Sequence, residues 1–133
     1  MSQEDTGQDS TRNNKMYFQP HILPICLPSS NDDLVGRLGW VTGWGKIQKE
    51  RKLMSDKLRQ VEVPIISNNL CERFFRESGQ SQYIPRIFLC AGYMDGGRDT
   101  CEGDSGGPLV VPGDDNRWFL AGLTSWGIGC GER

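Results

Sequence analysis

The chain has 133 residues, the size of one ordinary domain. Its 15 Lys and Arg against 17 Asp and Glu leave a net charge of −2, and no basic run suggests nucleic acid or an anionic membrane as a partner. No apolar run approaches the roughly 20 residues of a membrane-spanning helix, and the amino terminus lacks the apolar core of a secretory signal.

Cysteine is frequent, with five in this short sequence. Disulfide-rich domains belong to oxidising compartments, because cytosolic thiols are kept reduced. The cysteines therefore favour an extracellular protein, although the first residues carry no secretory signal.

The first segment, residues 1–17, contains few apolar side chains and several Asn, Asp and Ser. Such a composition buries too little apolar surface to offset the entropy lost on ordering. We expect residues 1–17 to be disordered or unrelated to the rest, and residues 18–133 to form one partial domain.

Apolar patterning then predicts strands separated by a surface loop. The G-W-V-T-G-W-G stretch from Gly39 is short, apolar and bracketed by glycines. Residues 46–57 are charged and have no clear period, which predicts a surface loop. Residues 58–65 alternate between apolar and polar, which predicts a half-buried strand, and residues 87–92 form the next apolar run.

A short helix is predicted between these last two strands. Residues 67–69 supply Ser and Asn side chains of the kind that cap helices. The following apolar residues are spaced so that they share one helical face: Leu70, Cys71, Phe74 and Phe75.

Two further apolar runs, residues 108–111 and 118–126, are separated by P-G-D-D-N-R. This separator is a strong turn signal. The pattern predicts an antiparallel hairpin that carries Ser105 at one end.

The stretch at residues 101–109, C-E-G-D-S-G-G-P-L, surrounds one hydroxyl with three glycines and a proline. Glycine permits backbone conformations and close approaches that a side chain would block. Gly103 and the pair at 106–107 can therefore leave N–H groups pointing into open space beside the Ser105 hydroxyl, which is the layout of an oxyanion hole. A glycine-rich turn with an incidental serine is the competing interpretation.

The G-D-S-G-G-P run at residues 103–108 resembles the signature of the trypsin/chymotrypsin family of serine proteases. The resemblance implies an all-β fold: an antiparallel Greek-key β-barrel, the second barrel of the chymotrypsin fold, truncated, with one short helix. F-Q-P-H-I-L-P-I-C-L-P, from Phe18, resembles the connector between the two barrels. C-A-G-Y-M-D-G-G and the run from Trp118 to Cys130 look most similar to arthropod clip-type or Stubble-like proteases.

The resemblance implies a serine endopeptidase that forms an acyl-enzyme, with no cofactor and no metal ion. Ser105 would be the nucleophile, and the backbone N–H groups of Gly103 and Ser105 would form the oxyanion hole. Asp104 would be the acid that pairs with the new amino terminus when a zymogen is cleaved.

The specificity pocket is implied in the same way. Asp99 lies six residues before the candidate nucleophile, where the family has the base of its primary pocket. A carboxylate in a narrow, partly dehydrated slot favours a cation, which implies cleavage of proteins or peptides after Arg or Lys. Ser125, Trp126 and Gly127 match the segment that binds an extended substrate backbone, and Gly127 and Gly129 would keep the entrance open. The competing interpretation of Asp99 is a solvated loop acid.

The family resemblance also pairs Cys71 with Cys90 and Cys101 with Cys130. Cys26 is left over, and its partner would lie outside this sequence; otherwise it is a free thiol. Glu102, next to the oxyanion hole, would at most tilt subsite preference toward basic residues.

No residue qualifies as the general base that a serine nucleophile needs. His21 is the sole histidine and lies in the Pro-rich connector, not in the family's A-A-H-C context, and Asp32 and Asp33 follow the connector in a Ser/Asn-rich loop. The resemblance therefore implies an incomplete triad and a chain that is close to inactive alone. The alternative is a non-catalytic protease homologue that binds partner proteins through this half-barrel.

Overall fold

The computed structural model describes residues 17–29, 32–47, 53–114 and 117–131. Almost all of the segment expected to be disordered, the middle of the expected surface loop and the centre of the expected hairpin turn lie outside these ranges. The described elements are, in chain order, β1 (Leu38–Gly43), β2 (Arg59–Ile66), α1 (Asn68–Glu77), β3 (Cys90–Ala91), β4 (Pro108–Pro112) and β5 (Trp118–Leu123).

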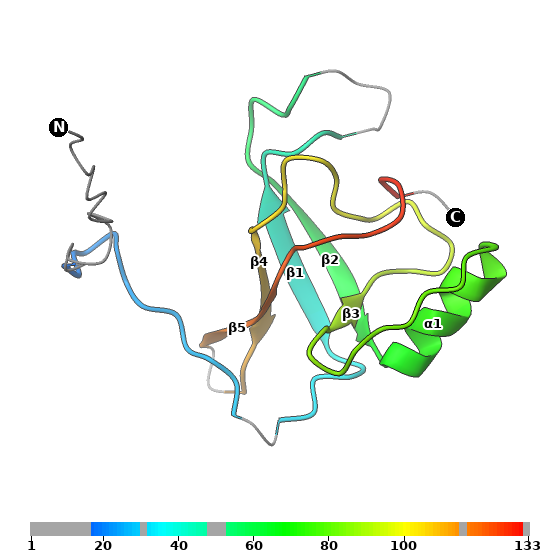
Figure 1. Cartoon of the computed structure of the whole chain (residues 1–133). Helices are drawn as coiled ribbons and strands as arrows, with labels where there is room; N and C mark the ends of the chain where they lie inside the picture. The colour runs from blue at the N-terminus through cyan, green and yellow to red at the C-terminus, as the bar shows by residue number, and fades with distance from the viewer. Residues whose placement is uncertain (1–16, 30–31, 48–52, 115–116, 132–133) are drawn as a thin grey trace, which may run out of the picture.

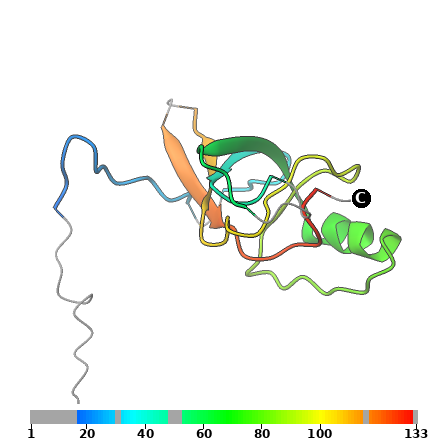
Figure 2. The same ribbon diagram turned by 90° about the horizontal axis from the view of Figure 1, so that it is seen from above.

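The strands form a single curled sheet in the order β3-β2-β1-β4-β5, and every neighbouring pair is antiparallel. Figure 1 shows β3 and β5 at the two edges, with α1 beside the β3 edge, and Figure 2 shows the curl from above. The expected all-β half-barrel with one short helix is confirmed. Within the described ranges, no helix has both the length and the apolar character that crossing a bilayer requires.

The strand pairing brings distant segments to the centre of the sheet. β1 pairs with β2 from Leu38 opposite Pro64 to Gly43 opposite Arg59. β4 and β5 form the predicted hairpin, with a shift in register after Leu109. The apolar run that continues to residue 126 leaves the sheet at the end of β5, three residues earlier than the sequence pattern suggested.

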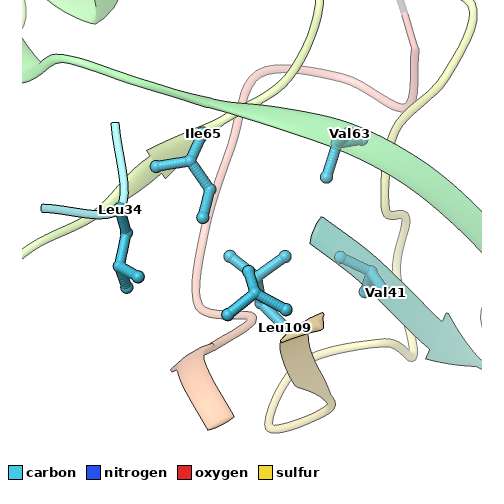
Figure 3. Packing of buried hydrophobic residues seen from close by; sticks show 6 residues of the cluster. Leu34, Val41, Val63, Ile65 and Leu109 are labelled. Atoms are coloured by element: carbon cyan, nitrogen blue, oxygen red, sulfur yellow. The ribbon is translucent and has the colours of Figure 1, made fainter. Parts of the chain in front are cut away.

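The core lies on the inner face of this curled sheet. Val63 and Ile65 are two positions apart on β2, so both side chains point to the same face. Figure 3 shows them converging with Leu34, Val41 and Leu109 from neighbouring segments. Ile65 is 1% exposed and Val111, which completes the cluster, is fully buried. The apolar side chains of the predicted alternating pattern therefore pack in the core.

The strand expected at residues 87–92 is mostly wrong, because only Cys90–Ala91 pairs with β2. The preceding residues turn instead, and the Phe88 N–H donates to the Pro85 carbonyl at 2.9 Å. The Asn68 side-chain amide donates to the carbonyls of both residues and to that of Ile84. The segment 85–88 is therefore held in a turn and does not pair with β2, which leaves β3 short.

The helix prediction is confirmed, and its start has the expected capping contact. The Ser67 hydroxyl accepts the Leu70 N–H at 3.3 Å, which satisfies one of the free donors in the first turn. Cys71 is the buried residue of α1, and its sulfur is bonded to that of Cys90. This disulfide ties the helix to the β3 edge of the sheet.

Candidate active site

Ser105 is exposed in the loop that enters β4. The loop depends on glycine on both sides of this serine: φ is +99° at Gly103 and +82° at Gly106. Residues with a side chain rarely adopt this left-handed region without strain. The glycines therefore permit a sharp turn that leaves the hydroxyl at the surface.

Hydrogen bonds attach this loop to the segment that follows β5. The Gly106 N–H donates to the Thr124 carbonyl and the Thr124 N–H donates to the Gly107 carbonyl, each at 2.8 Å. Gly107 also donates to the Asp104 carbonyl at 2.9 Å, which closes the turn around Ser105. The residue that follows Ser105 is thus hydrogen-bonded directly to the segment 124–127.

The backbone N–H groups of Gly103 and Ser105 donate to no other residue in the described ranges. Gly103 is covered on one side by Met54, whose terminal methyl would lie 2.8 Å from a Cβ added at this glycine. Two N–H groups with no acceptor among the described residues are available to hydrogen-bond an atom of a ligand.

The Asp104 side chain turns away from Ser105 and toward the end of β1. Its Oδ1 accepts the Gly45 N–H at 2.7 Å, and its Oδ2 accepts the Cys101 N–H at 3.0 Å. A Cβ added at Gly43 would lie 1.9 Å from Oδ1, so glycine is required there for the carboxylate to fit. The same carboxylate lines a cavity of about 170 Å³ that Asp99 also lines.

We expect Gly43→Ala to lower the free energy of unfolding by about 1–3 kcal/mol, the usual cost of forcing extra atoms into filled space. The added methyl must displace the Asp104 carboxylate. Urea denaturation measures the change. Gly122→Ala is the matched control, because a Cβ at this strand glycine meets nothing within 4 Å. Equal stability of Gly43→Ala and Gly122→Ala would contradict the placement of Asp104.

Asp99 also lines a larger cavity, which has a volume of about 520 Å³. Ser125, Trp126 and Gly127 line the same cavity, so the structure brings these four predicted site residues together. Gly129 is not among the lining residues, whereas Gly131, which sequence reasoning did not single out, is. Ser105 is not a lining residue either; its loop reaches the cavity wall through the hydrogen bonds to Thr124.

The Asp99 carboxylate is held by backbone donors. It accepts the Thr100 N–H at 2.7 Å and the Gly131 N–H at 3.0 Å. Burial raises the pKa of this carboxyl above its ordinary value of 3.8, and the hydrogen bonds from Gly131 and Thr100 offset part of that rise. Asp99 is nevertheless exposed, so its carboxylate remains accessible to a cation that enters the cavity.

The raised pKa of Asp99 has a consequence for stability. Above pH 3.8 the folded protein holds the Asp99 proton more tightly than the unfolded chain does, so this group stabilises the fold below that pH and its contribution is lost as pH rises through the folded pKa. Urea unfolding of the wild type and of Asp99→Asn across pH 3–8 measures this contribution. The free energy of unfolding of the wild type minus that of Asp99→Asn should fall as pH rises and then level off. A difference that rises with pH would contradict this.

Trp126 packs against two rings that anchor its segment. Its ring centroid lies 5.7 Å from that of Phe75 on α1 and 6.2 Å from that of Phe88, the latter edge-on. Such pairs contribute about 0.5–1.5 kcal/mol beyond their buried area. From the sequence, Phe75 was predicted only to lie on the apolar face of a helix. Its contact with Trp126, which supports the segment 125–127, has no local sequence signal.

The second disulfide joins the pair that the family resemblance implied. Cys101 is bonded to Cys130, which joins the loop before Ser105 to the segment after Trp126. Cys26 forms no disulfide within this chain and is half-buried. Its backbone carbonyl accepts the Leu120 N–H at 2.8 Å, so the connector lies along β5 at this point.

The three residues that the sequence did not assign to a triad lie in the connector and in the loop that follows it. His21 is exposed in a turn of the connector, the first part of which projects away from the sheet in both views (Figures 1 and 2). Asp32 accepts the Ser29 N–H and Asp33 accepts the Val35 N–H, both within their own loop. No three carboxylate, histidine or cysteine side chains of the described residues gather closely enough to hold a metal ion.

Comparison with known proteins agrees with this geometry. The family described as Trypsin matches residues 10–133. The chain is 52% identical to the serine proteinase stubble of Drosophila melanogaster over 117 residues, 47% identical to the serine protease filzig of the same fly over 115, and 44% identical to bovine (Bos taurus) coagulation factor XI over 119.

These alignments cover 88%, 86% and 89% of this chain but only 15%, 7% and 18% of the three relatives. The chain thus spans a small part of the length of each of these proteins. Because the family match includes nearly the whole chain and the relatives are so similar in sequence, the chain belongs to the trypsin family of serine proteases.

Proposed function

We propose that this chain carries the nucleophile and the specificity pocket of an extracellular serine endopeptidase that cleaves after Arg or Lys, within a peptidase region at residues 18–133. The observation that supports this most strongly is the exposed Ser105 on a loop that is hydrogen-bonded to the wall of a cavity lined by Asp99.

In the proposed reaction, the Ser105 hydroxyl attacks the carbonyl carbon of the scissile peptide bond and gives its proton to a general base. The N–H groups of Gly103 and Ser105 hydrogen-bond the oxyanion, since neither has an acceptor among the described residues. The amine leaves with the proton, and water then hydrolyses the acyl-enzyme.

The base is supplied from outside this chain, because His21 is exposed in the connector and the aspartates at 32 and 33 accept N–H groups of their own loop. Serine proteases that lack a residue of the triad accelerate peptide hydrolysis only about 10³–10⁴-fold over the reaction in water. The chain alone is therefore close to inactive, and activity belongs to the full-length protein that contains it. Cys26 is free to bond a cysteine outside this chain.

Asp104 is the acid that pairs with a new amino terminus after activating cleavage. Its carboxylate lines the 170 Å³ cavity, which is large enough for a terminal ammonium and a small apolar side chain. In the present arrangement the carboxylate is oriented into this space by the Gly45 and Cys101 N–H groups. An ammonium there would complete its charge pairing.

Mapping of cleavage sites tests the proposed function. The full-length, activated protein is incubated with an unfolded protein substrate, and the new termini are identified by mass spectrometry. Cleavage after Arg and Lys is expected. Cleavage after apolar residues would contradict the assignment of Asp99. No cleavage by correctly folded protein would favour the alternative, a non-catalytic homologue that binds partners through this half-barrel.

A further inference from the structure

Asn68, the first residue of α1, holds the loop that follows this helix. Its side-chain amide donates to the carbonyls of Ile84, Pro85 and Phe88 at 3.3, 3.1 and 3.2 Å. An amide has two N–H donors, so the three oxygens share them. All three acceptors lie beyond the end of the helix, so these bonds fix the loop against the start of α1.

The rest of this loop is anchored in two places. The Ile84 N–H donates to the Glu72 carboxylate, one turn further along α1, at 2.9 Å. After the loop, Cys90 is bonded to Cys71 of the same helix. The backbone around Phe88 is therefore fixed from both directions by side chains of α1.

Phe88 connects this arrangement to the segment proposed to bind the substrate backbone. Its ring meets Trp126 edge-on, and the Phe75 ring contacts Trp126 from α1 itself. Trp126 is exposed, and within the described ranges no backbone hydrogen bond joins residues 125–127 to another segment. The position of this segment therefore depends on the two ring contacts of the indole.

We propose that Asn68 is a positioning residue for substrate binding, which acts through Phe88 on Trp126. By fixing Phe88, it keeps the backbone of residues 125–127 where an extended substrate can pair with it. Asn68 then contributes to binding of the substrate residues that precede the Arg or Lys, and not to the pocket lined by Asp99. The inference rests on the proposed function, because it concerns how the same site binds its substrate.

The test compares two substrates of the full-length, activated protein, acetyl-Arg and acetyl-Ala-Ala-Ala-Arg, each joined to the same chromogenic amine. The alanines add backbone but little side chain, so the ratio of kcat/KM for the long substrate to that for the short one measures backbone pairing. Asn68→Ala should lower this ratio about two- to tenfold, the range expected when one aromatic contact is lost. The change should lie mainly in KM for the long substrate.

Asn68→Asp separates positioning of the loop from stability of the helix. A carboxylate has the shape of the amide but no N–H donor, and it would face three carbonyl oxygens. It would also be the first acidic side chain in the first turn of α1, where negative charge stabilises a helix. A role in the helix alone predicts an unchanged ratio, whereas positioning predicts a fall at least as large as in Asn68→Ala.

Asn69→Asp is the matched control and should keep the wild-type ratio. Asn69 lies in the same helical turn, is exposed, and has no side-chain hydrogen bond among the described residues. Phe88→Leu removes the ring but keeps the carbonyl, so it should lower the ratio as Asn68→Ala does. Combining Phe88→Leu with Asn68→Ala should give no further fall, because the two residues act through one contact. Phe88 is exposed, so this variant remains informative if Asn68→Ala folds poorly.

An unchanged ratio in Asn68→Asp or in Phe88→Leu would overturn the inference. An equal fall in Asn69→Asp, a further fall in the double variant, or equal kcat/KM of the wild type on the two substrates would do the same. Active-site titration counts the folded enzyme, whose loss lowers both rates equally and leaves the ratio unchanged. Cleavage of neither substrate by the folded wild type would instead refute the proposed function, and the inference with it.

Discussion

Replacing Ser105 by alanine is expected to lower kcat of the full-length, activated protein on an Arg-containing peptide by about 10⁶-fold, the loss measured when the nucleophile of a serine protease is removed. Alanine lacks the oxygen that forms the acyl-enzyme, while the turn around it is retained because its hydrogen bonds come from backbone groups. Hydrolysis of a chromogenic Arg peptide measures the change, and KM should change much less than kcat.

Ser81→Ala is the matched control for this variant. Ser81 is also exposed and lies in a loop, between α1 and β3. Its replacement should leave kcat within about twofold of the wild type, as surface substitutions usually do. If Ser105→Ala retained more than a few per cent of activity, Ser105 would not be the nucleophile.

The second large effect is expected at Asp99. Asp99→Asn should lower kcat/KM for Arg and Lys peptides by about 10⁴-fold, because a substrate cation would enter a partly dehydrated cavity without an opposite charge. The amide has nearly the same shape as the carboxylate and can still accept one of the N–H groups of Thr100 and Gly131. Rates with a matched set of peptides that carry Arg, Lys, Leu or Phe before the scissile bond measure the change.

Rates on the Leu and Phe peptides should fall far less, so the preference for basic residues should largely disappear. Asp56→Asn, at an exposed position outside both cavities, is the control and should preserve this preference. An unchanged Arg preference in Asp99→Asn would place the cation-binding group elsewhere in the protein.

Local patterns in the sequence were sufficient for several elements of the fold. The capping serine and apolar face predicted α1, the alternation around Val63 predicted β2, and the turn signal predicted the β4–β5 hairpin. Each of these signals acts over a few residues, so it can be found without knowledge of what the segment packs against. The glycines around Ser105 predicted a sharp turn for the same reason.

Long-range contacts at the site left no such local signal. The bond from Gly45 to Asp104 spans 59 positions, and the ion pair of Lys46 with Glu102 spans 56. The need for glycine at Gly43 follows only from the arrival of the Asp104 carboxylate. Likewise, β3 is short because the segment 85–88 turns, with the Asn68 amide bound to two of its carbonyls. These features depend on how the sheet curls, which no local pattern specifies.

The central claim is that the Ser105 hydroxyl is the nucleophile, and labelling with a fluorophosphonate tests it most directly. The full-length, activated protein is treated with the probe, digested and sequenced by tandem mass spectrometry to locate the modified residue. We predict one phosphonyl group on Ser105, with fluoride released and peptidase activity lost in proportion to labelling. Loss of activity with the adduct on another residue, or full activity with Ser105 modified, would contradict the claim.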